Sequence, residues 1–121
     1  MITLIGEFTD LNTYVNAERS NRFIGAKIKR ENNDNVLRQL TLKEVVTEYP
    51  VRMTYKWFTK DLRKDPSNVA FAIKYIEDAL VTKGILRNDT RKEICEICHK
   101  FDLDKNNPRV EITIEHVPVL T

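Results

Sequence analysis

The sequence predicts a single α/β (α+β) domain, residues 1–121, in which helices pack on a small mixed β-sheet. Three observations lead to this class. Short segments at both ends and in the middle alternate apolar and polar residues, as half-buried strands do. Between them, apolar residues recur at helical spacing. A length of 121 residues suits one hydrophobic core and leaves no room for a second domain.

The first third of the chain predicts a strand followed by helices. Residues 2–8 alternate apolar and polar side chains, which is the period of a strand. Residues 10–13 offer helix-capping residue types, and residues 14–40 are dominated by helix formers. We expect one or two helices there, with a break near residues 32–34, where Asn-Asn-Asp occurs.

The middle of the chain predicts a second strand and the clearest helix. Residues 51–58 alternate between an apolar face and a largely basic one. The following helix has Asp65 as a plausible N-cap, Pro66 in its first turn and Gly84 at its end. Its apolar stripe consists of Val69, Ala72, Ile73, Ile76 and Leu80.

Two strand-like segments, residues 93–103 and 109–117, close the chain. Residues 104–108, Asp-Lys-Asn-Asn-Pro, are turn formers, so we expect the two segments to form a hairpin. The order of strand, helices, strand, helix and hairpin indicates a mixed sheet with helices packed on it.

Basic residues are clustered although the net charge is only +2. Residues 52–64 carry five basic residues and one acidic residue, and half of the 18 acidic residues collect in the last 45 positions, from residue 77 onward. The cluster nearest the N-terminus contains no acidic residue and consists of Arg19, Arg22, Lys27, Lys29 and Arg30. These clusters fit either a surface that faces a phosphate backbone or ordinary solvated faces.

The helix that begins at Asp65 is also expected to carry a second stripe of side chains beside the apolar one. Asp89 follows this helix and could fold back towards the same face. Carboxylates such as these two are the ligands that Mg²⁺ requires for phosphodiester hydrolysis, and a lysine nearby could contact the phosphate. The stripe consists of Ser67, Phe71, Lys74 and Asp78. From the residues alone, a helix cap, a surface ion pair and a turn residue explain the pattern equally simply.

A longer motif resembles a known family. Asp65-Pro-Ser-Asn68, then Asp78-Ala-Leu80, then Gly84-Ile-Leu-x-Asn-Asp89 is similar to the D-P-D-N, D-A-L and G-x-I/L-x-N-D pattern of RusA-like crossover junction endodeoxyribonucleases, the Holliday junction resolvases, in their phage and prophage branch. Residues 11–27 and 104–111 resemble the same branch. The resemblance therefore covers most of the chain.

The resemblance implies a homodimer that binds four-way DNA junctions and cuts two strands symmetrically, using Mg²⁺ or Mn²⁺ and a basic surface that includes residues 19–30. By position, Asp65 and Asp89 match metal ligands of the family. Asn68 matches the Asn of the motif, with a structural or ligand-supporting role. Lys74 matches the helix lysine, whose spacing differs between branches.

Ser67 departs from the family pattern, which has a second metal-binding Asp there. A neutral hydroxyl is a poorer ligand for Mg²⁺ than a carboxylate. Three explanations are open: a natural variant that uses Asp78 or water instead, a resolvase reduced to junction binding, or an engineered replacement that suppresses cleavage.

Cys95-Glu-Ile-Cys-His99 matches the pattern of covalent haem attachment, but we expect no haem. Such proteins mature outside the cytoplasm, and the N-terminus shows no export signal or membrane span. The motif also lies in a segment that alternates like a strand, so we expect two ordinary strand thiols and no closed zinc site.

Aromatic residues allow two interpretations. Tyr55 and Trp57 alternate on a strand and are expected in the core, although stacking on DNA bases is the other possibility. Phe71 lies off the apolar stripe, which suggests a wedge against unstacked bases or packing against a partner subunit.

We therefore expect a cytoplasmic endonuclease of a bacterium or a phage-infected host cell. One rival is a non-catalytic junction-binding protein of the same fold, which would bind branched DNA without Mg²⁺ and without cutting it. Another is a small structural or protein-interaction domain, which would not prefer branched over linear DNA.

Overall fold

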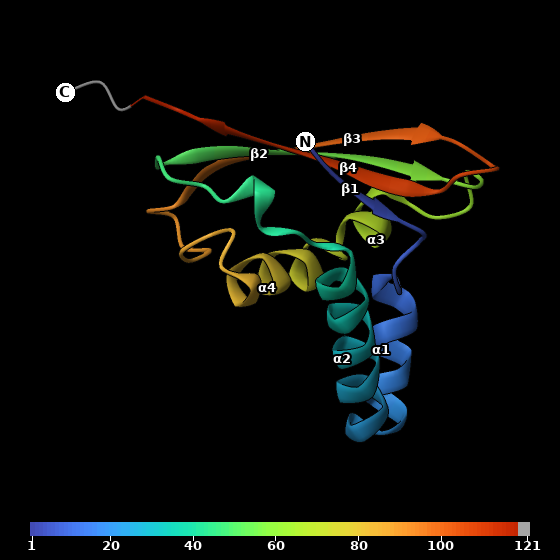
Figure 1. The fold of residues 1–121 in the computed structure, drawn as a ribbon. Coiled ribbons are helices and arrows are strands. Elements are labelled where there is room, and N and C mark those ends of the chain that lie inside the picture. Colours follow the sequence, from blue (N-terminus) through green and yellow to red (C-terminus); the bar gives the residue numbers. More distant parts are fainter. Residues whose placement is uncertain (119–121) are drawn as a thin grey trace.

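The computed structural model describes residues 1–118 and confirms the predicted class, one small α+β domain with a mixed sheet. All helices lie on one side of the sheet (Figure 1). No helix within residues 1–118 is both long and apolar enough to cross a membrane. In chain order the elements are β1 (Ile2–Ile5), α1 (Leu11–Ser20), α2 (Arg22–Gln39), the 3-10 helix η1 (Leu42–Glu44), β2 (Val51–Thr59), α3 (Pro66–Ala70), α4 (Ile73–Lys83), β3 (Ile94–Leu103) and β4 (Arg109–His116).

The sheet has the strand order β1-β4-β2-β3. β4 is antiparallel to both β1 and β2, whereas β3 is parallel to β2. The predicted hairpin of residues 93–103 and 109–117 is therefore wrong, because β2 lies between these strands. The turn passes over the end of β2, where the Asp104 N–H donates to the Thr59 carbonyl at 2.9 Å. The turn residues are compatible with a hairpin and with a connection that passes over β2. The second arrangement is found because β2 pairs with both β3 and β4.

The hydrophobic core lies between the sheet and α4. β2 contributes Tyr55 and Trp57, which are buried as expected. α4 contributes four buried residues, Tyr75, Ile76, Ala79 and Leu80. Of the predicted apolar stripe, Ala72, Ile76 and Leu80 are buried, whereas Val69 and Ile73 are partly buried. The alternation of β2 therefore directs its apolar side chains towards the helices.

The break between the first two helices lies at Asn21, so the prediction of a break near residues 32–34 is wrong. Asn21 has an extended backbone, and its Oδ1 accepts from the Phe23 N–H at 2.8 Å, which caps the start of α2. Asn32 stays helical because its side chain is used elsewhere. Its Nδ2 donates to the Ile28 carbonyl at 2.8 Å and to the Thr9 hydroxyl at 2.9 Å.

The helix predicted from Asp65 to Gly84 is two helices, α3 and α4, separated by a turn at Phe71 and Ala72. Hydrogen bonds across this turn tighten from the i+4 to the i+3 pattern, as in the bond from the Lys74 N–H to the Phe71 carbonyl at 3.2 Å. The predicted polar stripe is therefore interrupted between its second and third members. Gly84 ends α4 as expected, in the left-handed conformation with φ 87°.

α1 and α2 form a helical hairpin, residues 11–39, that projects away from the sheet (Figure 1). We call this hairpin the arm. The two helices approach closely at Gly25, where an added Cβ would lie 3.0 Å from the Cβ of Glu18. This close approach holds the two helices together near the tip of the arm, where Phe23 is exposed.

Candidate functional site

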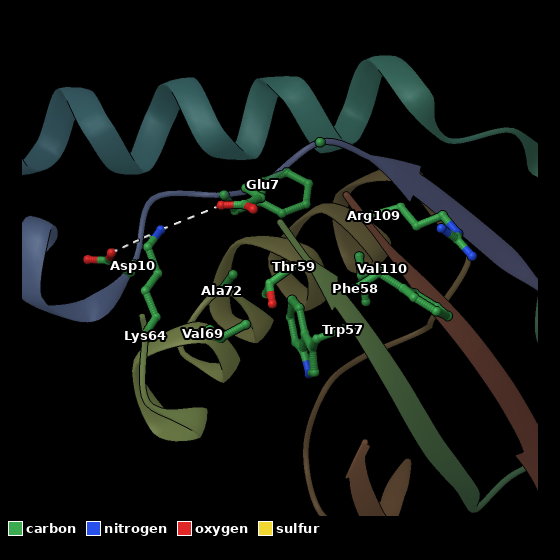
Figure 2. A pocket seen from close by; sticks show the side chains of 12 residues that line it. Glu7, Asp10, Trp57, Phe58, Thr59, Lys64, Val69, Ala72, Arg109 and Val110 are labelled. Carbon is green, nitrogen blue, oxygen red and sulfur yellow. Dashed lines mark ion pairs between the residues drawn. The ribbon is translucent and has the colours of Figure 1, made fainter. Parts of the chain in front are cut away.

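Lys64 connects the base of the arm to the segment that carries Asp65. Its Nζ lies 3.1 Å from the Asp10 carboxylate and 3.7 Å from that of Glu7. Figure 2 shows the Lys64 side chain pointing towards both carboxylates across a pocket. Asp10 directly precedes α1, so the ion pairs place the start of α3 beside the start of the arm.

Asp10 is a buried carboxylate with two partners, Thr13 and Lys64. Its Oδ1 accepts from the Thr13 N–H at 2.8 Å, which caps α1. Burial acts to raise the pKa of Asp10, but the hydrogen bonds from Thr13 and Lys64 outweigh it, so the pKa lies below its usual value. The carboxylate is therefore charged and holds both α1 and Lys64.

Two further contacts join the arm to α3. The Asn68 Oδ1 accepts from the Asn12 N–H at 2.9 Å, which gives the motif's Asn a structural role in this chain. The Phe71 ring packs against Tyr14 of α1, with centroids 5.5 Å apart, and meets Tyr75 edge-on. Phe71 is thus half-buried against its own chain. This packing differs from both expectations, a wedge against DNA bases and a contact with a partner subunit.

Asp65 lies at the start of α3 with an exposed side chain. Its carboxylate makes no capping hydrogen bond, although its backbone carbonyl accepts from the N–H groups of Asn68 and Val69. It lines an open cleft of about 450 Å³ together with Asp61, Lys64 and residues of β3. Asp65 is therefore available to a ligand in this cleft.

Asp89, Lys74 and Asp78 gather around a residue that the sequence did not single out, Glu77 of α4. The Glu77 carboxylate is half-buried and accepts from the Tyr55 hydroxyl at 2.8 Å. Burial raises its pKa most, and the charges of Asp89 and Asp78 raise it further. The Tyr55 hydrogen bond and the charge of Lys74 oppose this shift without cancelling it.

Part of the predicted basic cluster lies beside α4. Lys29 and Arg30 of α2 line one groove with Tyr75, Asp78 and Thr82 of α4. Arg22 lies at the other end of α2, with its guanidinium 5.3 Å from the centre of the exposed Phe23 ring. The predicted DNA-binding residues therefore extend from the groove to the tip of the arm.

The residues expected to hold Mg²⁺ do not form a three-ligand cluster in the part of the chain that the structure describes. Within residues 1–118, no group of three or more His, Cys, Asp or Glu side chains lies close enough to hold a metal ion. Asp65 and Asp89 therefore do not belong to a three-ligand set, and Ser67 is exposed without a carboxylate to add.

The C-x-x-C-H segment lies on β3, as the strand prediction required. Cys95 and Cys98 are free thiols. His99 is half-buried, and its Nδ1 accepts from the Trp57 Nε1–H at 2.9 Å. Burial lowers the pKa of His99, so the neutral ring packs in an aromatic row with Trp57 and Tyr55.

Sequence patterns did not identify Asp10, Lys64 and Glu77 as parts of the site. Asp10 was visible only as a helix cap, and Lys64 only as one member of a basic run. Glu77 borders the apolar stripe of α4, and a charged residue at such a border was the available signal. Its raised pKa depends on β2, which is distant in sequence.

A scan against protein-family models finds no match for this chain. A search of curated proteins likewise finds no match.

Proposed function

We propose that this chain is a RusA-like, Mg²⁺-dependent endonuclease that binds four-way DNA junctions as a homodimer and cuts them symmetrically, with Ser67 limiting cleavage. The proposed setting is the cytoplasm of a bacterium or a phage-infected cell. The observation that carries the proposal is the attachment of a basic arm to the Asp65 segment through Lys64, Asn68 and Phe71.

The arm supplies the DNA-binding surface in this proposal. Residues 11–39 contain six basic and three acidic residues. Within residues 1–118, Lys27 is paired with Glu31 at 3.8 Å, whereas Arg19, Arg22, Lys29 and Arg30 form no ion pair. Unpaired cations on a projecting element favour contact with phosphates, because binding releases the counterions of the DNA.

Asp65 is the carboxylate best placed to act near bound DNA, because it lies at the base of the arm and is exposed. In the family pattern Mg²⁺ would supply an activated water and charge stabilisation. The described residues do not form a three-ligand set for this ion. Lys74, exposed on α4, is the proposed phosphate contact.

The deciding experiment is cleavage of a labelled synthetic four-way junction with Mg²⁺ or Mn²⁺, with metal-free binding followed in parallel. The chain is compared with Ser67→Asp and with Asp89→Asn. Paired symmetric cuts by the unaltered chain, lost in Asp89→Asn, support the proposal. The Ser67→Asp variant is expected to cut at least about tenfold faster, because it restores a carboxylate ligand. Absence of both junction preference and cutting in every form would refute it.

A second candidate is a junction-binding protein without nuclease activity. Ser67 favours it, because a neutral hydroxyl stands where the family pattern has a metal-binding Asp. This candidate predicts saturable binding of branched DNA that does not depend on Mg²⁺, and no cleavage even at high Mn²⁺. Cleavage that appears only after Ser67→Asp would identify a resolvase silenced at one ligand.

The arm's contribution is tested by salt titration of junction binding. Replacing Arg22 or Lys27 with Ala should weaken binding and reduce the slope of log K against log salt by about one for each phosphate that the variant no longer neutralises. Lys43→Ala, an exposed lysine of η1 outside the arm, is the matched control. An unchanged slope for the arm variants would show that these residues of the arm do not contact DNA phosphates.

A further inference from the structure

The two edges of the sheet are protected to different degrees. β1 has only four residues, and Gln39 occupies its edge by accepting from the Ile5 N–H at 2.7 Å and donating to the Ile5 carbonyl at 3.2 Å. β3 has ten residues, and within residues 1–118 no strand or side chain covers its outer backbone groups from residue 96 to 102. A long open edge is ready to pair with another strand.

The helix-side face of β3 is apolar and only partly covered. Ile97, Phe101 and Leu103 are 46%, 43% and 47% exposed, although their register partners on β2 face the core. Leu62, 82% exposed, lines the same cleft as Phe101 and Leu103. The apolar face of the sheet thus continues past the helices that cover it, as it does where a partner adds to a sheet.

A second copy of β3 fits this edge in one antiparallel register. If a two-fold axis passes through Phe101 perpendicular to the sheet, Phe101 faces its own copy across the axis. Lys100 then lies opposite Asp102 of the second copy, and this ion pair occurs twice by symmetry. His99 lies opposite Leu103 on the apolar face. Within residues 99–103, apolar residues are therefore matched on one face and charged residues on the other.

Neighbouring registers lack this match. An axis at Lys100 or at Asp102 would place that residue opposite its own copy, with like charges in contact. An axis at His99 would place Asp102 opposite Glu96, which are both acidic. Like charges directly opposite one another destabilise a strand pair, so these three registers are disfavoured.

An axis at Cys98 is the remaining competitor. It would pair Glu96 with Lys100, but it would place Phe101 opposite Cys95, where the β2–β3 register shifts. Leu103 would then lie beyond the regular pairing. This register leaves Phe101 and Leu103 unmatched, and only Ile97 gains a strand partner, His99.

We infer that two copies of this chain associate through antiparallel pairing of their β3 strands, with the two-fold axis at Phe101. The inference deepens the homodimer of the proposed function by naming its interface, and it requires no nuclease activity. The combined sheet joins both four-stranded sheets and places both arms on the same side. Two symmetric arms on one side match the two-fold symmetry of a four-way junction.

Charge-swap variants test the interface without DNA, by sedimentation velocity on the full chain. The unaltered chain is expected to sediment as a dimer of twice 14.2 kDa. Lys100→Asp alone and Asp102→Lys alone each create two like-charge pairs and should raise the dimer dissociation constant about tenfold or more. An equimolar mixture of the two variants restores both ion pairs and should form the dimer again.

Lys43→Asp makes the same charge change on η1 and should leave the dimer intact. Circular dichroism confirms that each variant is folded. The interface would be overturned if the unaltered chain is a monomer or if the mixture does not recover the dimer. Recovery when Lys100→Asp is mixed with Glu96→Lys, and not with Asp102→Lys, would favour the Cys98 register instead. A dimer that ignores junction DNA would contradict only the proposed function.

Discussion

The arm and α4 differ in how much of their surface they bury. In the arm, residues 11–39, only Gly25 and Val36 are buried, whereas α4 buries four of its eleven residues. α4 is therefore held by hydrophobic burial against the sheet. The arm is held by its caps, by the close approach at Gly25, by Val36 in the core and by polar and aromatic contacts at its base. Most of its surface is therefore available to a partner.

The largest expected effect is in the core. Leu80 of α4 is fully buried, so Leu80→Ala should lower the free energy of unfolding by about 2–5 kcal/mol. Ile24→Ala in the arm, where the side chain is 46% exposed, is the matched control and should change it by about 0.5 kcal/mol or less. Urea unfolding measures both. Equal losses would show that the arm is as tightly packed as α4.

The next effect is at the helix crossing of the arm. Gly25→Val introduces a branched side chain where even a Cβ would lie 3.0 Å from the Glu18 Cβ, so the helices must separate, at a cost of about 1–3 kcal/mol. Ala26→Val, at the exposed neighbouring position, should cost about 0.5 kcal/mol or less. If thermal unfolding shows the same cost for both, the crossing does not hold the arm together.

A smaller effect is expected at the base of the arm. Asp10→Ala removes the cap of α1 and the partner of Lys64, and should cost about 1 kcal/mol. Asp10→Asn keeps a capping oxygen and should cost less. Because the folded pKa of Asp10 lies below its usual 3.8, the stabilisation by its charge is fully present above pH 3.8. It is lost as the pH falls through the folded pKa.

Unfolding measured at neutral and acidic pH checks this sign. The difference between the unaltered chain and Asp10→Asn should shrink as the solution becomes acidic. A difference that stayed constant with pH would mean that the charge of Asp10 contributes nothing to the link between the arm and Lys64.

The smallest effect has the opposite sign. The folded pKa of Glu77 lies above its usual 4.5, so the folded state disfavours the charged form at neutral pH. Glu77→Gln can still accept from the Tyr55 hydroxyl and should stabilise the chain by less than about 1 kcal/mol at pH 7. The gain should vanish as the pH falls below 4.5, where Glu77 is protonated and as neutral as the glutamine that replaces it. A loss of stability at pH 7 would contradict this account.

The sequence by itself determined the features that depend on neighbouring residues. The α+β class, the apolar alternation of β2 and the end of α4 at Gly84 were all predictable, because strand period, helix period and a left-handed glycine are local properties. Asp65 was predicted at the start of a helix for the same reason. The resemblance at residues 65–89 added a functional hypothesis.

Tertiary structure decided what depends on residues distant in the chain. Asn32 stays in a helix because it binds Thr9, which no local pattern reveals. β3 and β4 are separated because the backbone of β2 pairs with both of them, although the turn between them suits a hairpin equally well. Lys64 belongs to the site because two carboxylates before α1 meet it in space. Such choices reflect competition between partners for the same groups, which only the complete fold resolves.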